Sequence, residues 1–137
     1  MPTTFTTPQD AEDAYYDAID ESDMAAMAGV WEESEEVLCL LPMLPAYRGS
    51  NAVLGAWGEI LGSGRPPQLH IRHLTWIEHG DLAIHLVEEL LSLPQQPLPQ
   101  PIYATNIYRR GGDGWRLLVH QNSPTPPPPE LQMPERS

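Results

Sequence analysis

The 137-residue sequence predicts one α+β domain, with helices in its first half and antiparallel strands in its second half. Apolar residues recur with helical spacing over residues 8–29, and a third helical segment follows near residue 50. The later part alternates β-forming runs with glycine-containing turns, at residues 68–78, 81–91, 102–108 and 115–122. We therefore expect three N-terminal helices packed on the concave face of a curved, mostly antiparallel sheet.

The first helix has a clear start signal and one apolar stripe. Thr7 occupies the expected N-cap position, and Pro8 suits the first helical position because its missing N–H needs no partner there. The stripe follows at the spacing i, i+3, i+4, i+7, i+8 and consists of Ala11, Ala14, Tyr15, Ala18 and Ile19. This stripe predicts the side of the helix that faces the core.

Two shorter helices are expected after the first one. The second begins near Ser22 or Asp23 and ends at Gly29, where glycine favours a helix C-terminus. Ser50 is the predicted cap of the third, whose apolar stripe is Val53, Ala56, Trp57, Ile60 and Leu61.

The strands are predicted from apolar runs and from the turns between them. Residues 37–41, Val-Leu-Cys-Leu-Leu, form a continuous apolar run that is typical of a buried strand. His79-Gly80 is the predicted two-residue turn of a long hairpin, and a Gly-Gly-Asp-Gly turn closes the last hairpin. The segment 94–101, Pro-Gln-Gln-Pro-Leu-Pro-Gln-Pro, is predicted to be a loop because its prolines lack backbone donors.

Composition excludes several classes of function. The net charge is −12 with only seven Lys and Arg, which argues against binding to nucleic acids or anionic membrane surfaces. The N-terminus lacks the basic and apolar regions of a secretory signal, and no apolar run reaches the length of a membrane helix, so we expect a cytoplasmic protein. Cys39, the single cysteine, lies in an apolar run and is predicted to be a buried, unreactive thiol.

Four motifs together resemble the NTF2-like superfamily, and specifically its SnoaL-like branch, which includes polyketide cyclase and ketosteroid isomerase-like proteins. They are Tyr15-Tyr16 in the first helix, Trp31 ahead of the strand VLCLLP, the segment RGSNAVLGAWGEIL, and the closing hairpin ATNIYRRGGDGWRLLVHQNSP. The resemblance implies a cone-shaped fold, a pocket between sheet and helices, and a homodimer. Members include isomerases, cyclases, dehydratases and non-enzymatic binding domains, so the fold does not determine the activity.

The predicted domain covers residues 8–124, between a flexible N-terminus (1–7) and a disordered proline-rich tail (125–137).

The chain departs from the ketosteroid isomerases in one respect. Those enzymes carry a catalytic carboxylate near the strand after the second helix, where this chain has the acid-free segment 37–42. A general base must lie within hydrogen-bond reach of the proton that it removes, so another residue would have to act here.

Strand alternation identifies His73 and Glu88 as a tentative catalytic pair. If His79-Gly80 is the turn, both fall on the more apolar face of the hairpin, as its only ionisable groups, and become diagonal neighbours. A His–Glu pair in an apolar cavity has the altered proton affinities of an acid–base site, although such a pair also occurs as a structural element.

The same reasoning predicts ligand-binding residues. They are Tyr16, Trp31, Trp57, Asn106 and Gln121. Leu118 and His120 are expected on the convex face, in a dimer interface. No metal site is expected, because His70 and His73 stand three apart on a strand and so point to opposite faces. No cofactor motif is recognised either.

These observations predict a domain that binds a small hydrophobic ligand in its pocket, with or without catalysis. The first alternative is an isomerase, cyclase or hydratase that acts on a hydrophobic carbonyl compound with a His/Glu acid–base pair. The second alternative is a dimeric protein-interaction module, with the proline-rich tail as the segment that recruits a partner.

Overall fold

The computed structural model describes residues 3–64, 68–91 and 101–123. Most of the predicted proline-rich loop and the whole predicted tail lie outside the described residues. Among those described, no helix has both the length and the apolar character needed to cross a membrane.

Three helices form the first half, as predicted: α1 (Pro8–Glu21), α2 (Met24–Val30) and α3 (Ser50–Gly62). The Thr7 hydroxyl caps α1 by accepting a hydrogen bond from a backbone N–H of the first turn at 3.1 Å. Asp23 caps α2 in the same way. The third helix differs by one residue from the prediction, because Gly49 occupies its N-cap position and Ser50 is already helical.

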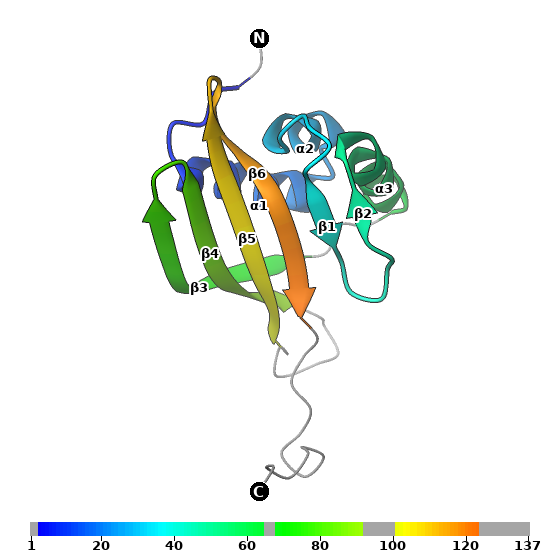
Figure 1. The fold of residues 1–137 in the computed structure, drawn as a ribbon. Coiled ribbons are helices and arrows are strands. Elements are labelled where there is room, and N and C mark those ends of the chain that lie inside the picture. The colour runs from blue at the N-terminus through cyan, green and yellow to red at the C-terminus, as the bar shows by residue number, and fades with distance from the viewer. Residues whose placement is uncertain (1–2, 65–67, 92–100, 124–137) are drawn as a thin grey trace, which may run out of the picture.

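Six strands form one open, mostly antiparallel sheet in the order β2-β1-β6-β5-β4-β3, which confirms the predicted fold class (Figure 1). The strands are β1 (Leu38–Leu40), β2 (Tyr47–Arg48), β3 (Leu69–His79), β4 (Leu82–Leu91), β5 (Pro101–Gly111) and β6 (Gly114–Ser123). Only β1 and β6 pair in parallel among them. No strand was predicted at the short β2.

The turns of the two long hairpins decide which side chains face the helices. The first hairpin reverses at Gly80-Asp81, one residue later than predicted, since His79 pairs with Leu82. Gly80 has a φ of 61°, in the left-handed region that glycine adopts at no steric cost. In the last hairpin, Arg110 pairs with Trp115 across the predicted Gly-Gly-Asp-Gly turn.

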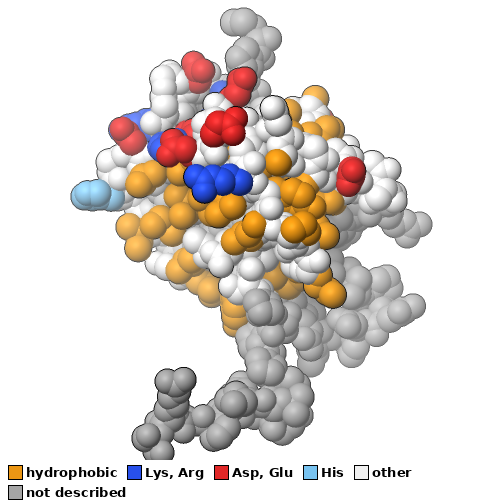
Figure 2. Space-filling view, turned by 45° about the vertical axis from the view of Figure 1, so that its right-hand side comes forward, with side chains coloured by type: hydrophobic (Ala, Val, Ile, Leu, Met, Phe, Trp, Pro, Cys, Tyr) orange, Lys and Arg blue, Asp and Glu red, His pale blue; other side chains and the backbone are white. Residues whose placement is uncertain are grey.

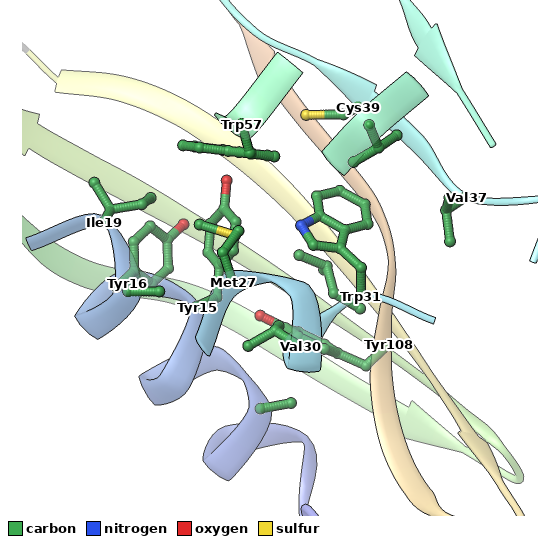
Figure 3. Packing of buried hydrophobic residues seen from close by; sticks show 14 of the residues in the cluster. Tyr15, Tyr16, Ile19, Met27, Val30, Trp31, Val37, Cys39, Trp57 and Tyr108 are labelled. Carbon is green, nitrogen blue, oxygen red and sulfur yellow. The ribbon is translucent and has the colours of Figure 1, made fainter. Parts of the chain in front are cut away.

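The core lies between the helices and the helix-covered face of the sheet, called the inner face below. Tyr15 stands at its centre, and its ring meets those of Tyr16, Trp31 and Trp57 edge-on at centroid distances of 4.8–6.2 Å (Figure 3). The predicted burial of Trp57 and Leu61 is confirmed, while Ile60 is only half-buried.

Two further segments close this core. Phe5, which precedes the predicted domain start, is buried, and its carbonyl accepts a hydrogen bond from the Trp115 N–H at 2.8 Å. Cys39 is fully buried on β1, as predicted, and burial raises the pKa of its thiol to about 12.

The other face of the sheet, called the outer face below, is not covered by helices (Figure 1). An apolar row crosses it through directly paired residues of four strands: Ile77, Ile84, Ile107 and Val119. In Figure 2, with the side carrying β1, β2 and α3 turned forward, hydrophobic side chains cluster over the middle and lower parts of the molecule. Most charged groups in that view lie toward its upper end.

Candidate functional site

Buried polar side chains form a continuous hydrogen-bonded network on the inner face, surrounded by the apolar core. They come from α1 and from the three strands β4, β5 and β6, because alternate residues of each strand point toward the helices. The buried members are Glu12, Tyr16, His85, Glu89, Asn106, Tyr108 and His120. His73 and Asn122, which are half-buried, complete the network at its two ends.

Glu12 is the centre of the first half of the network. Its Oε2 lies 2.9 Å from Nδ1 of His85 and accepts a hydrogen bond from the Tyr108 hydroxyl at 3.1 Å. Its other oxygen, Oε1, contacts Nε2 of His73. The Glu12 side chain is 1% exposed, so these partners replace the water that a carboxylate normally binds.

The pKa of the Glu12 carboxyl shows the balance between burial and these partners. Burial alone raises this pKa, but the hydrogen bonds and positive charges of His85 and His73 oppose it and lower the pKa below its ordinary value. Glu12 is therefore an ionised group inside the protein, held by imidazoles on two neighbouring strands.

The Tyr16 hydroxyl and the Asn106 amide join the two halves of the network. The Asn106 Nδ2 donates to the Tyr16 hydroxyl at 3.0 Å, and this hydroxyl donates to Oε2 of Glu89 at 2.7 Å. The same Nδ2 lies 3.5 Å from Oε2 of Glu12. Two buried carboxylates, on α1 and β4, are thus connected through one amide and one phenol.

His120 lies in the second half, between two amide oxygens. Its Nδ1 is 2.6 Å from Oδ1 of Asn106, and its Nε2 is 2.9 Å from Oδ1 of Asn122. Both amide nitrogens donate elsewhere, to the Tyr16 hydroxyl and to Glu89, which determines that the oxygens face the ring. A neutral imidazole has one N–H and can satisfy only one of these oxygens.

Opposing effects act on the proton of His120. Burial lowers the pKa of the imidazole, while the Glu89 carboxylate and the hydrogen bond with Asn122 oppose that lowering. The Nε2 of His120 lies 3.8 Å from Oε2 of Glu89. The site therefore pairs a carboxylate with an imidazole that is held mainly in its neutral form.

A cavity of about 330 Å³ adjoins this second half. Glu89, His120 and Asn122 are its polar lining groups, and apolar or aromatic side chains supply most of the remainder. The apolar and aromatic lining residues are Tyr15, Ile19, Leu41, Pro42, Leu44, Trp57, Ile60, Leu69 and Ile102. We call this the apolar pocket.

Tyr15, one of the residues that line the apolar pocket, carries an unusual buried group. Its hydroxyl is buried and has no hydrogen-bond partner among the described residues. A buried hydroxyl without a partner costs free energy of about 1–3 kcal/mol, so such groups are uncommon in proteins.

The predicted pairing of His73 with Glu88 is wrong. His73 points to the inner face and contacts Glu12, whereas Glu88 lies on the outer face, where Arg72 donates to its Oε1 at 2.7 Å. The acidic partner of His73 thus comes from α1, 61 residues away in the chain.

Two features of the hairpin explain this error. Leu74 is a β-bulge, because His73 pairs with Val87 while Thr75 pairs with Leu86, and the extra residue reverses the alternation of β3. In addition, the more apolar face of β4, with Ile84 and Leu86, is the outer face and not the inner one. The inner face of β4 instead carries His85 and Glu89.

A second bulge, at Leu118, changes the assignment of β6. Ile107 pairs with Val119 and Tyr108 pairs with Leu117, so residues after Leu118 have reversed faces. Gln121, predicted to line the pocket, is exposed, and His120, predicted on the convex face, is buried inside. Both placements were wrong for the same reason.

The other predicted site residues lie in different surroundings. Trp57 lines the apolar pocket, and Asn106 and Tyr16 lie in the network beside it. Trp31 lines a separate hollow of about 450 Å³, together with Glu32 and Arg109. These two form an ion pair, with Nη2 of Arg109 2.5 Å from Oε2 of Glu32. The structure thus brings three of the five predicted ligand-binding residues to one region.

Glu12, His85 and Glu89 were not predicted from the sequence. A signal existed for Glu12, which precedes Tyr15 by three residues and Tyr16 by four, and so borders the apolar stripe of α1. His85 and Glu89 alternate along β4 with the buried residues Ala83 and Val87 at a spacing of two, so all four side chains point to the same face of the sheet. Recognition of Leu74 as a bulge would have identified these positions as the inner face.

Glu12, His73 and His85 are also the kind of residues that bind metal ions. Their potential ligand atoms all lie within 4.8 Å of one another, and they form the only such group found among the described residues. The network therefore contains two chemically distinct regions, one at the apolar pocket and one around Glu12.

Solved structures provide two close comparisons. A protein from Thiobacillus denitrificans, provisionally described as a calcium/calmodulin-dependent protein kinase type II association domain, is 34% identical with a TM-score of 0.83. The match covers 90% of this chain and 99% of that one. An NTF2-like protein from Streptomyces avermitilis, provisionally described as a dehydratase, is 27% identical with a TM-score of 0.75, covering 85% and 92% of the two chains.

A more distant structure shows the same fold. An NTF2-like protein of unknown function from Pseudomonas putida is 18% identical over 84% of this chain and 82% of that one, with a TM-score of 0.70. Among curated proteins, none matches this sequence. The family model of the SnoaL-like domain matches residues 9–127, nearly the whole chain. This chain therefore belongs to the SnoaL-like domain family, within the NTF2-like fold.

Proposed function

We propose that the apolar pocket binds a small, mainly hydrophobic molecule that carries a hydroxyl or carbonyl oxygen. The observation that carries this proposal is the pocket's composition, since a lining that is mainly apolar surrounds the joined polar groups Glu89, His120 and Asn122. Pockets that bind small molecules commonly have this composition, and a volume of about 330 Å³ lies within their usual range.

The experiment uses two small probes, 2-naphthol for the hydroxyl class and 2-cyclohexen-1-one for the carbonyl class, titrated calorimetrically into the protein. Glu89→Gln should weaken binding at least about 10-fold, because hydrogen bonds to charged groups contribute about 1.5–3 kcal/mol. Glu88→Gln is the matched control, because this neighbouring glutamate lies on the outer face. The absence of saturable binding up to about 1 mM of either probe, or equal losses in both variants, contradicts the proposal.

A second function, acid–base catalysis on the bound molecule, is favoured by the Glu89–His120 pair. A carboxylate and a mainly neutral imidazole 3.8 Å apart can remove a proton from one atom of a ligand and return it to another. This transfers the proposed acid–base role from His73 and Glu88 to residues at the pocket. The description of the Streptomyces avermitilis relative as a dehydratase is compatible with this chemistry.

Deuterium exchange tests this second function directly. In D₂O, the wild-type protein should catalyse incorporation of deuterium next to the carbonyl of 2-cyclohexen-1-one, measured by proton NMR. Glu89→Gln should remove this activity and Glu88→Gln should retain it. If the wild type binds 2-cyclohexen-1-one but incorporates no deuterium into it, the catalytic proposal is rejected and the ligand-binding proposal still stands.

We also propose that two copies of the chain associate through the outer face. The row formed by Ile77, Ile84, Ile107 and Val119 supports a dimer, because a continuous apolar surface across four strands is unfavourable in water. Leu118 and His120, the residues first predicted for this interface, are not part of the row. The resemblance to an association domain is compatible with self-association.

Light scattering on Ile107→Lys tests the assembly. The wild type should have twice the monomer mass of 15.3 kDa, and the variant should be a monomer because a charge in the row opposes burial. Met43→Lys is the control, since Met43 is a fully exposed apolar residue outside the row. A monomeric wild type at micromolar concentration would reject the dimer.

A further inference from the structure

We propose that Glu12, His73 and His85 bind a divalent transition-metal ion through one carboxylate and two imidazoles. This site is separate from the apolar pocket and does not depend on the function proposed for that pocket. Helix α1 supplies the carboxylate, and the neighbouring strands β3 and β4 supply one imidazole each.

The distances are compatible with a metal ion after small side-chain rotations. Metal–ligand bonds of about 2.0–2.2 Å place the ligand atoms around one ion about 3–3.5 Å apart. Here all the candidate atoms lie within 4.8 Å of one another, and His85 Nδ1 is 2.9 Å from a Glu12 oxygen. An ion entering between them would move His73 away from Glu12, which its partly exposed position permits.

The donor set indicates the class of ion. Two imidazoles with one carboxylate suit Zn²⁺, Fe²⁺, Co²⁺ and Ni²⁺, and they are a poor set for Ca²⁺ and Mg²⁺, which prefer oxygen ligands. Three protein ligands also leave at least one coordination position for water or another molecule.

The surroundings already hold the carboxylate in a defined orientation. The Tyr108 hydroxyl and the Asn106 amide both donate to Oε2 of Glu12, at 3.1 and 3.5 Å. Groups that orient a ligand from behind in this way commonly contribute 10–100-fold to metal affinity. His73 faces Oε1 and His85 faces Oε2, so the proposed ion would lie between this oriented carboxylate and the two imidazoles.

An entry path exists beside the cluster. The His73 side chain is 28% exposed, and a hollow of about 210 Å³ borders His85. Thr7, Gln9, Trp76 and Glu78 are among the residues that line it. An ion can therefore reach His73 and His85 without opening the core.

Trp76 provides an internal probe for binding. Its ring centroid lies 5.1 Å from that of His73 and 5.8 Å from that of His85. A paramagnetic ion such as Co²⁺ at the site should quench Trp76 fluorescence. The other three tryptophans lie in the core and serve as the constant background.

The experiment titrates Co²⁺ into the full chain by tryptophan fluorescence and Zn²⁺ by calorimetry. One ion should bind per chain, and His73→Gln, His85→Gln and Glu12→Gln should each weaken binding at least 10-fold. Tyr108→Phe should weaken it about 10–100-fold by removing a donor to Glu12. Trp76→Phe should remove the fluorescence change while leaving the calorimetric affinity unchanged.

His70→Ala and His79→Ala are the controls for nonspecific imidazole binding, because both residues are exposed and lie outside the cluster. Neither should alter affinity. Because Glu12→Gln and His85→Gln change buried groups, circular dichroism checks their fold, and His73→Gln provides a variant at the exposed edge. Absence of binding by the folded wild type at millimolar Zn²⁺ and Co²⁺ overturns the proposal. Binding lost in the His70 or His79 control and retained in His73→Gln also overturns it.

Discussion

The Tyr16 hydroxyl donates a 2.7 Å hydrogen bond to Oε2 of Glu89, across 73 residues of sequence. Tyr16 lies on α1 and Glu89 on β4, so this bond joins the helical layer to the sheet in the middle of the core. The neighbouring Tyr15 is also buried, yet its hydroxyl has no partner among the described residues. These adjacent phenols therefore contribute to stability in opposite ways.

Replacing each tyrosine with phenylalanine should separate these contributions. Tyr16→Phe should lower the free energy of unfolding by about 1–3 kcal/mol, because Glu89 loses a donor in a buried site. Tyr15→Phe should leave the free energy unchanged or raise it slightly, because it removes a desolvated hydroxyl. Urea unfolding measures both values. Equal losses in the two variants would contradict this prediction, because the unpartnered Tyr15 hydroxyl would then stabilise the fold as much as the hydrogen-bonded Tyr16 hydroxyl.

The buried imidazole of His120 predicts a pH dependence of stability. Burial lowers its pKa in the folded protein below the ordinary value of 6.5, so the unfolded chain binds the proton first as the pH falls. The contribution of His120 to stability is therefore fully present above about pH 6.5 and is lost as the pH falls through the folded-state pKa.

His120→Gln should remove this part of the pH dependence. Unfolding free energies measured between about pH 5.5 and 7.5 should fall toward acid more steeply in the wild type than in the variant. His79→Gln is the control, because His79 is exposed and its replacement should leave the slope unchanged. If the unfolding free energy of His120→Gln falls toward acid as steeply as that of the wild type, another titrating group causes the pH dependence.

The fold could be predicted because its signals are local. Thr7 followed by Pro8 marks the start of α1, and the glycine turn aligns Arg110 with Trp115. Each signal lies within a few residues of the structure that it determines. The two-residue strand β2 could not be predicted, because its pairing with β1 depends on partners elsewhere in the fold.

The candidate site was predicted less well, because it depends on the alternation of long strands. A single extra residue at Leu74 or Leu118 reverses every assignment beyond it, and neither bulge contains glycine or another sequence signal. The expectation that the more apolar face lies inside was wrong for β4. Glu89 and His85 can be buried because Tyr16 and Glu12 on α1 form hydrogen bonds with them, which offset the cost of removing these polar groups from water. Both partners are distant in sequence.

Gly114 should be the glycine least tolerant of substitution. It has a φ of 93°, and a Cβ there would lie 2.5 Å from the backbone oxygen of Phe5. Gly114→Ala should therefore destabilise the protein by more than about 1 kcal/mol, measured by thermal or urea unfolding. Gly112→Ala is the matched control in the same turn, because nothing lies within 4 Å of its Cβ position. Similar stability of the two variants would show that Phe5 moves aside readily.

The apolar pocket predicts a contrast between two enlarging substitutions on α3. Ile60 is half-buried and lines the pocket, whereas Val53 is fully buried in the packed core. Ile60→Trp can place its larger ring in the hollow of about 330 Å³, so the free energy of unfolding should change by less than about 1 kcal/mol.

Val53→Phe has no such space and should cost about 1–3 kcal/mol or more through overpacking. Ile60→Trp should in addition abolish calorimetric binding of 2-naphthol, since the new ring occupies the volume that the probe needs. Unfolding and binding measured on the same two variants distinguish a true cavity from a surface depression. If Ile60→Trp binds the probe like the wild type, the ligand lies elsewhere, because a ring of this size cannot share the pocket with it.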